Sequence, residues 1–138
     1  MLKRIPKILS PDLVKILMEM GYGDEILLAD ANYPSASSAQ KLVRADGHAL
    51  PKILDAILEL FPLDLMSDSP VTLMEITTDD KPSILEEYFK LLKKYDYDFC
   101  CKYKSKDEFY CSGRKSYAIV ATGETSLYAN IILRKGVV

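Results

Sequence analysis

Short apolar runs alternate with amphipathic helical segments along this chain of 138 residues. Runs such as Ile26–Ala29 and Val71–Ile76 are too short for typical helices and carry apolar residues on both sides, so they predict strands buried on both faces. Buried strands need helices as cover on each side. The pattern therefore predicts an α/β fold with three layers, in which a mixed β-sheet lies between helices.

Three segments carry the apolar spacing and the end signals of helices. The first begins at the pair Ser10-Pro11, a good capping residue followed by proline at the first helical position, and ends near Gly21. The second begins near Pro51 and stops before Pro62, and the third follows Pro82. Their apolar stripes are Leu13, Leu17 and Met20; Ile53, Ile57 and Leu60; and Leu85, Tyr88 and Leu92.

The remaining segments suggest strands and loops. Ala31–Gln40 is small and polar and is expected to be a loop, while Ser105–Ser112 is expected to form a short helical turn. Few residues separate the last two strands, too few for a parallel crossover, so these strands should be antiparallel or lie apart, which makes the sheet mixed. The expected strands are Ile26–Ala29, Leu42–Ala45, Val71–Ile76, Asp98–Tyr103, Tyr117–Ala121 and Tyr128–Leu133.

Length and composition narrow the class of protein. The length suits one domain, residues 1–138. A net charge of −2 and a pI of about 5.4 offer no basic surface for nucleic acid, and no apolar run reaches the roughly 18 residues of a membrane span. The three cysteines lack metal-site spacing and His48 is the one histidine, which disfavours a disulfide framework and a zinc site. We expect a cytoplasmic protein that binds neither nucleic acid nor membrane.

Asp30 and Tyr22 are the first candidate site residues. Asp30 directly follows a buried apolar run, and functional groups in open α/β sheets collect at carboxyl ends of strands, although aspartate there is also common turn chemistry. Tyr22 lies between Gly21 and Gly23, which free the backbone to place the ring in a cleft or over a helix end. The stretch precedes a strand and lacks the third glycine of a dinucleotide motif, so nucleotide binding is excluded there. Tyrosines and a carboxylate near strand ends suit sugar binding.

Several separated segments resemble one known family. The opening ILSPDLVKILMEMGYGDEILLADANYP is similar to the start of the L-fucose mutarotase family, which is related to the D-ribose pyranases. The likeness continues in order at LVRADG (42–47), FPLD (61–64) and YAIVATGETSLYANIILRKGV (117–137). It covers nearly the whole chain and is closer to the fucose branch than to the ribose branch.

The resemblance implies an isomerase that needs no metal and no cofactor. Such an enzyme interconverts the α and β anomers of free L-fucose by general acid–base opening and closing of the sugar ring. It also implies a homo-oligomer, expected to be a decamer, with sites at subunit interfaces. Carried over by motif, Asp30 is a sugar ligand, Tyr128 shares proton transfer, and Asn130 binds a sugar hydroxyl. Tyr128 and Asn130 are expected to share one face of the last strand.

Two positions depart from the family pattern. Tyr22 stands where the family has its catalytic histidine, and a phenol, with a pKa of about 10, is a poor base at neutral pH although it can donate a proton. Lys106 stands in place of an arginine, which keeps the charge but loses the planar fork. The hypothesis is that Tyr22 acts as the acid, helped by Lys106 or Tyr128. Two alternatives stay open: a D-ribose pyranase or other sugar mutarotase, and a sugar-binding protein without catalysis.

Overall fold

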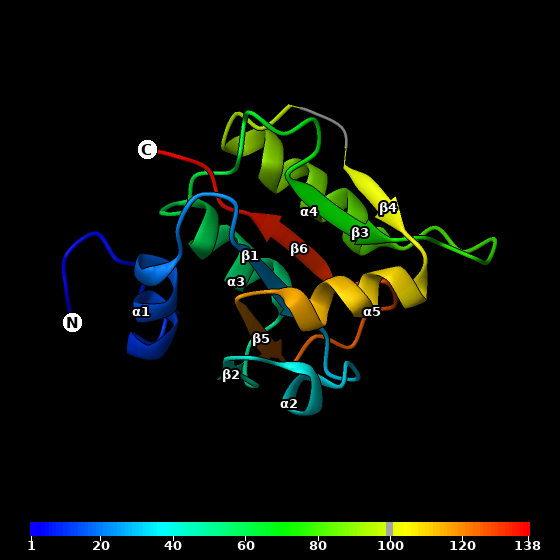
Figure 1. Cartoon of the computed structure of the whole chain (residues 1–138), viewed down its shortest axis with the longest axis horizontal. Helices are drawn as coiled ribbons and strands as arrows, with labels where there is room; N and C mark the ends of the chain where they lie inside the picture. The colour runs from blue at the N-terminus through cyan, green and yellow to red at the C-terminus, as the bar shows by residue number, and fades with distance from the viewer. Residues whose placement is uncertain (99–100) are drawn as a thin grey trace.

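The computed structural model describes residues 1–98 and 101–138. In these parts of the chain, six strands form one sheet in the order β2-β5-β1-β6-β3-β4 (Figure 1). β6 is antiparallel to its two neighbours, β1 and β3, whereas the other pairs are parallel, so the predicted mixed sheet is confirmed. The strands are β1 (Glu25–Ala29), β2 (Leu42–Ala45), β3 (Val71–Met74), β4 (Lys102–Lys104), β5 (Ala118–Thr122) and β6 (Ile131–Arg134).

Helices cover both faces of this sheet, which confirms the layered α/β fold. One apolar cluster joins one face of the sheet to α1, α3 and α4, and a smaller one joins the opposite face to α5. The helices are α1 (Pro11–Glu19), α2 (Ser35–Ser38), α3 (Leu50–Leu58), α4 (Ser83–Lys94) and α5 (Lys106–Lys115). Within the described residues, no helix is long and apolar enough to cross a bilayer.

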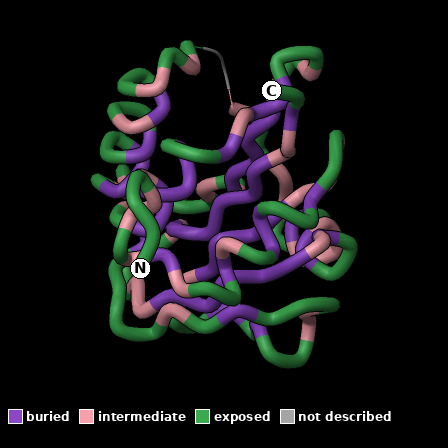
Figure 2. Tube along the Cα trace, turned by 90° about the vertical axis from the view of Figure 1, so that its left-hand side faces the viewer, coloured by how far each residue is buried: buried purple, intermediate pink, exposed green. Residues whose placement is uncertain are grey.

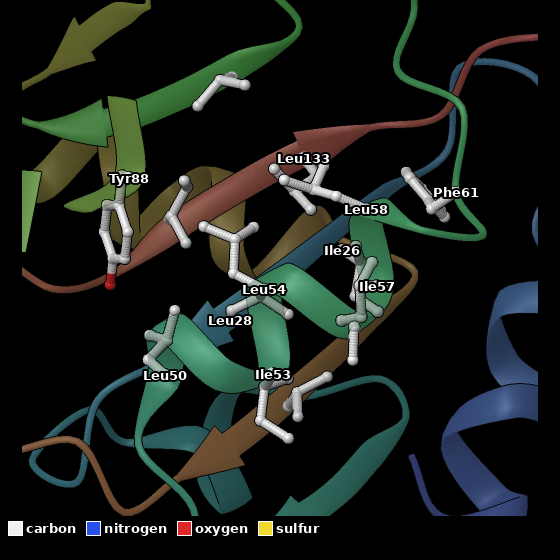
Figure 3. Packing of buried hydrophobic residues seen from close by; sticks show 14 of the residues in the cluster. Ile26, Leu28, Leu50, Ile53, Leu54, Ile57, Leu58, Phe61, Tyr88 and Leu133 are labelled. Atoms are coloured by element: carbon white, nitrogen blue, oxygen red, sulfur yellow. The ribbon is translucent and has the colours of Figure 1, made fainter. Parts of the chain in front are cut away.

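The larger cluster is built around α3. Ile53, Leu54 and Ile57 are fully buried and face β1 and β6, where Ile26 and Leu133 are also fully buried (Figure 3). Burial of an aliphatic side chain of this size stabilises the fold by about 1.5–3 kcal/mol. β5 is buried along its whole length, and β1, β3 and β6 are buried except for one half-buried residue at one end, while exposed segments lie at the outside of the molecule (Figure 2). This is the double cover that the continuous apolar runs predicted.

Several predicted boundaries need correction, and β3 ends at Met74 instead of Ile76. The stretch Ala31–Gln40 is not all loop, because α2 forms directly after Pro34, whose ring presets a near-helical φ. The last strand does not begin at Tyr128, because this residue has a φ of +58°, which no strand accommodates, and β6 begins at Ile131. The strand expected at Asp98–Tyr103 is the shorter β4, and positions 99 and 100 lie outside the described residues.

The expected short turn at Ser105–Ser112 is the ten-residue helix α5. Ser105 accepts a hydrogen bond from the backbone N–H of Glu108 and donates its own hydroxyl to the Glu108 carboxylate. This is a variant of the capping box, in which a capping serine and an acid three residues later support each other. The S-x-x-E pattern was present in the sequence and signals a full helix start.

His48 is exposed, and Cys101 and Cys111 are half-buried. Cys100 lies outside the described residues. No group of histidine, cysteine, aspartate and glutamate side chains that could hold a metal ion occurs in residues 1–98 and 101–138.

Gly113 lets α5 pack closely against the loop that follows β1. A methyl group at Gly113 would overlap the hydroxyl of Tyr33, which is buried between α5 and the sheet. Within the described residues this hydroxyl has no hydrogen-bond partner. Burial raises the pKa of Tyr33 to about 12, so the phenol stays neutral at ordinary pH.

We expect Gly113→Ala to lower the free energy of unfolding by about 1–3 kcal/mol, because the overlap forces α5 away from the sheet. Tyr33→Phe is the matched control: it removes the clashing oxygen and an unpaired buried hydroxyl, so its stability should equal or exceed that of the wild type. The double variant should recover most of the loss. Urea unfolding followed by circular dichroism measures all three, and a double variant as unstable as Gly113→Ala would contradict the close packing.

Candidate functional site

The sheet topology gathers most of the predicted site residues at one edge. β1 to β5 all run in the same direction, so the residues that follow them lie at the edge that we call the carboxyl edge. Because β6 runs the opposite way, the residues that precede it lie at the same edge. Asp30 follows β1, Lys106 follows β4, and Tyr128 and Asn130 precede β6. Four of the five predicted residues therefore share one edge.

Asp30 and Asn130 hold each other in place. The backbone N–H of Asp30 donates to Asn130 Oδ1 at 2.8 Å, and Asn130 Nδ2 donates to Asp30 Oδ2 at 3.3 Å. The other carboxylate oxygen of Asp30 accepts the backbone N–H of Asn32 at 2.9 Å. Asn130 is buried, with 5% of its surface exposed, while Asp30 is half-buried. Asn130 thus orients the Asp30 carboxylate, which keeps free lone pairs for further hydroxyl groups.

Partial burial raises the pKa of Asp30, and the negative charge of Glu124 adds to this effect. The hydrogen bonds from Asn32, Tyr33 and Asn130 oppose the rise. Burial outweighs these bonds, so the carboxylate is held in a less polar environment than a surface aspartate. Such a carboxylate forms stronger hydrogen bonds to a ligand hydroxyl than it would in water.

Tyr128 lies at the same edge in an uncommon backbone conformation. Its φ of +58° is left-handed, so Tyr128 and Asn130 do not share a strand face, and the strand argument for their common direction was wrong. The buried Tyr88 fixes the turn by donating its hydroxyl to the carbonyl of Ala129 at 2.6 Å. The Tyr128 hydroxyl lies 3.3 Å from the Thr78 hydroxyl. Hydrogen bonds with Thr78 and Thr77 lower the pKa of Tyr128, which suits a proton donor.

Two aromatic rings, those of Tyr110 and Tyr33, lie between Lys106 and the Asp30 loop. It is the first residue of α5 and is exposed, with its ammonium 5.7 Å from the centre of the Tyr110 ring. That ring packs against Tyr33 with centroids 4.9 Å apart, and the Tyr33 N–H donates to the Asp30 carbonyl. The charge of Lys106 is thus presented on the helix that covers the Asp30 loop.

A pocket of about 430 Å³ opens beside Asp30. It is lined by residues of the Asp30 loop and α2, by the ends of β2 and β5, and by the ion pair of Arg44 and Asp46, whose closest atoms are 2.6 Å apart. Of the five predicted residues, Asp30 is the one that lines it. Hydroxyl groups, a guanidinium and carboxylates together provide both donors and acceptors for a hydroxylated ligand.

Tyr22 lies at the opposite edge of the sheet. It precedes β1, so the five residues of that strand separate it from Asp30, and a strand of this length spans roughly 16 Å. One monosaccharide cannot bridge this separation within one chain. The structure therefore does not bring Tyr22 and Asp30 together in a single subunit. The Tyr22 side chain is 55% exposed and available for contact with another molecule.

Asp64 and Arg134 are neighbours of Tyr22 that were not predicted as site residues, although both lie in segments that resemble the family. Arg134 Nε donates to Asp64 Oδ2 at 2.9 Å, and the backbone N–H of Met66 donates to Oδ1 at 3.0 Å. Burial opposes ionisation of Asp64, which is only 2% exposed. The hydrogen bonds from Arg134 and Met66 and an interaction with the Tyr22 hydroxyl outweigh burial and lower the pKa of Asp64.

A weak signal for this cluster was present in the sequence. Asp64 lies between Leu63 and Leu65, and an acid inside an apolar stretch needs a cationic partner when it is buried. The partner is not visible from spacing, because Arg134 lies 70 residues further along and meets Asp64 only through the sheet.

Comparisons with known proteins come from sequence and structure. Residues 3–138 match the model of the RbsD / FucU transport protein family. Human fucose mutarotase is 44% identical over 144 residues, covering 99% of this chain and 94% of the human protein. The crystal structure of a fucose mutarotase from Streptococcus pneumoniae in complex with L-fucose is 55% identical, with a TM-score of 0.96 and 99% of each chain covered.

A more distant structure agrees in fold alone. RbsD of Bacillus subtilis, solved with D-ribose, is 23% identical with a TM-score of 0.78 and covers 94% of this chain and 95% of its own. The matches in sequence extend over nearly the whole chain, and the sheet order and site edge described above lie within them. The chain belongs to the RbsD / FucU family, in its fucose mutarotase branch.

Proposed function

We propose that this protein is an L-fucose mutarotase, which interconverts the α and β anomers of the free sugar. The observation that carries the proposal is the likeness to the Streptococcus pneumoniae fucose mutarotase bound to L-fucose, 55% identical over 99% of both chains. The carboxyl edge supports it, because an oriented carboxylate and a tyrosine lie there together. These groups suit the binding of hydroxyls and the transfer of protons.

The reaction needs two proton transfers. One group takes the proton of the anomeric hydroxyl while another gives a proton to the ring oxygen, so that the ring opens to the aldehyde. The carbonyl group then rotates, and the ring closes on its other face as both protons return. Each general acid–base contribution is worth about 10²–10⁴-fold in rate. A positioned tyrosine and a positioned base are sufficient for this chemistry.

The roles follow from the surroundings of each residue. Asp30 accepts hydrogen bonds from sugar hydroxyls, and the buried Asn130 holds Asp30 in the required direction. Tyr128, whose pKa is lowered by Thr78 and Thr77, donates the proton to the ring oxygen. Lys106 contributes positive charge at the rim of the site. The sequence hypothesis made Tyr22 the acid. Because Tyr128 takes that role at the edge that holds Asp30, we assign Tyr22 instead to the proton of the anomeric hydroxyl, in place of the family's histidine.

This assignment requires two chains for one site. Tyr22 lies at the amino ends of the parallel strands and Asp30 at their carboxyl ends, so a sugar that touches both must lie between subunits. The expected assembly is a homodecamer in the cytoplasm. Large exposed apolar side chains, Met1, Leu2, Met18 and Met66 among them, suit contacts between chains.

We expect the protein to accelerate exchange between the two anomers of L-fucose. Saturation transfer between the anomeric proton signals, with and without protein, measures it directly, and D-ribose is the matched control sugar. Faster exchange for D-ribose instead of L-fucose would replace the proposed substrate with that of the ribose branch. Binding of L-fucose without faster exchange would identify a sugar-binding protein, the alternative favoured by the absence of a histidine at position 22.

Tyr22→Phe should slow the exchange by about 100-fold or more while L-fucose still binds, because the variant loses one proton-transfer group and keeps the carboxyl edge. Asp30→Asn should weaken L-fucose binding. When the two variants are co-expressed, mixed assemblies should regain activity at about one quarter of their sites, since random mixing pairs an intact Tyr22 with an intact Asp30 from another chain. No recovery in mixed assemblies would contradict a site formed between subunits.

A further inference from the structure

Tyr22, Asp64 and Arg134 form a compact cluster at the amino edge of the sheet. Tyr22 and Gly23 form the turn before β1, where Gly23 has a φ of +85° and a methyl group at this position would approach the Arg134 guanidinium to 3.1 Å. The Gly23 N–H donates to the carbonyl of Lys135 at 2.9 Å, and the Asp64 N–H donates to the carbonyl of Arg134 at 3.0 Å. These backbone hydrogen bonds hold the turn at Tyr22 and the loop at Asp64 against the end of β6, where Arg134 lies.

Asp64 is a buried carboxylate that pairs with Arg134 and supports the turn at Met66. Each of its oxygens accepts one hydrogen bond, from Met66 and from Arg134, which leaves lone pairs for a third donor. The exposed phenol of Tyr22 belongs to the turn that meets the Arg134 guanidinium, the partner of Asp64. Tyr22 also lowers the pKa of Asp64, as a hydrogen-bond donor does. Glu25, the first residue of β1, also interacts electrostatically with Arg134.

The cluster contains a proton acceptor, which the proposed function needs and Tyr22 alone does not supply. A phenol alone is a poor base at neutral pH, so Tyr22 cannot simply replace an imidazole as proton acceptor. A carboxylate can accept the proton if the phenol passes it on. We propose that Tyr22 and Asp64 act as a two-step proton relay, in which Asp64 is the positioning residue that orients Tyr22 and takes its proton. The proposal rests on the proposed function.

The relay balances over one ring opening. The anomeric O–H bond breaks and its proton moves to Tyr22 Oη, while the proton already on Oη moves to the Asp64 carboxylate. The electron pair of the broken O–H bond forms the carbonyl as the bond between the anomeric carbon and the ring oxygen breaks, and the ring oxygen takes a proton from Tyr128. Ring closure reverses every transfer, so Tyr22, Asp64 and Tyr128 end in their starting states.

Arg134 keeps Asp64 ionised between turnovers. Its guanidinium donates to the carboxylate at 2.9 Å and, with Met66 and Tyr22, overcomes the effect of burial on the pKa. A group with a lowered pKa stays ionised until the pH falls through that lowered value. The relay should therefore keep its proton acceptor charged in mildly acidic solution, where an imidazole is already protonated.

We expect Asp64→Asn to slow anomer exchange of L-fucose by about 100-fold, because Tyr22 then has no proton acceptor behind it. Asp68→Asn, an exposed aspartate in the same loop, is the matched control and should leave the rate unchanged. Tyr22→His in the Asp64→Asn background should restore exchange, because an imidazole accepts the proton without Asp64. Recovery also shows that the loss in Asp64→Asn was not a folding defect.

The outcomes separate the relay from the proposed function. If the wild type accelerates exchange and Asp64→Asn is equally fast, the relay is wrong and the mutarotase function stands. If the double variant is as slow as Asp64→Asn, Asp64 serves the fold or the sugar directly and the relay is again wrong. If the wild type accelerates exchange of no sugar, the proposed function and the relay both fail.

The pH profile provides an independent readout. Between about pH 7 and about pH 5, the enzyme-catalysed rate of the wild type, corrected for buffer and acid catalysis, should fall less than that of Tyr22→His with Asp64 intact. The lowered pKa keeps Asp64 ionised, and any loss from Asp30, whose pKa is raised, is common to both proteins. The rate of Tyr22→His with Asp64 intact should fall over the same interval as the imidazole, with an ordinary pKa of about 6.5, becomes protonated. A wild-type rate that falls in parallel with the variant would overturn the relay.

Discussion

The antiparallel insertion of β6 between β1 and β3 is the constraint on which the site depends. Ile131, Ile132 and Leu133 are fully buried, so this strand can satisfy its backbone groups only by pairing with both neighbours. Its reversed direction places Asn130 beside Asp30 at one end and Arg134 beside Asp64 at the other. A parallel strand in the same position would carry each residue to the wrong edge.

Each end of β6 therefore supports a different half of the proposed chemistry. At the carboxyl edge, burial raises the pKa of Asp30 and hydrogen bonds lower that of Tyr128, so the two groups at this edge are adjusted in opposite directions. At the amino edge, the pair of Arg134 and Asp64 supports an exposed tyrosine. Neither half contains everything that the exchange of anomers needs. The proposed reaction is thus tied to assembly, because the two edges of one sheet meet only across copies of the chain.

The departure at position 22 is understandable in this setting. Replacing an imidazole by a phenol removes a base that works near neutral pH, yet keeps an aromatic group that donates a hydrogen bond. In the proposed relay the buried Asp64 compensates for this loss, and its pairing with Arg134 lowers its pKa. In the proposal, two connected side chains carry out the proton transfer that one histidine performs in the family. This is a physical alternative to loss of function, and it needs no change in the fold.

Local sequence signals predicted most of the fold. The continuous apolar runs indicated buried strands, and Ser10-Pro11 marked the start of α1, where the Ser10 hydroxyl accepts the N–H of Leu13. The same signals predicted less well where backbone conformation depends on distant partners. Tyr128 looked like part of a strand because its neighbours are apolar, but the turn held by Tyr88 forces a positive φ there.

The sequence by itself determined the layered α/β class and the family, and it predicted Asp30, Tyr128 and Asn130 as site residues, because periodicity and motifs are local properties of the chain. Only the tertiary structure decided that Tyr22 and Asp30 lie at opposite edges of the sheet, and that the buried Asn130 holds Asp30. It also decided that the ion pair of Asp64 and Arg134 lies beside Tyr22. The reason is physical: strand order and direction bring together residues up to 100 positions apart, and no local pattern encodes that pairing.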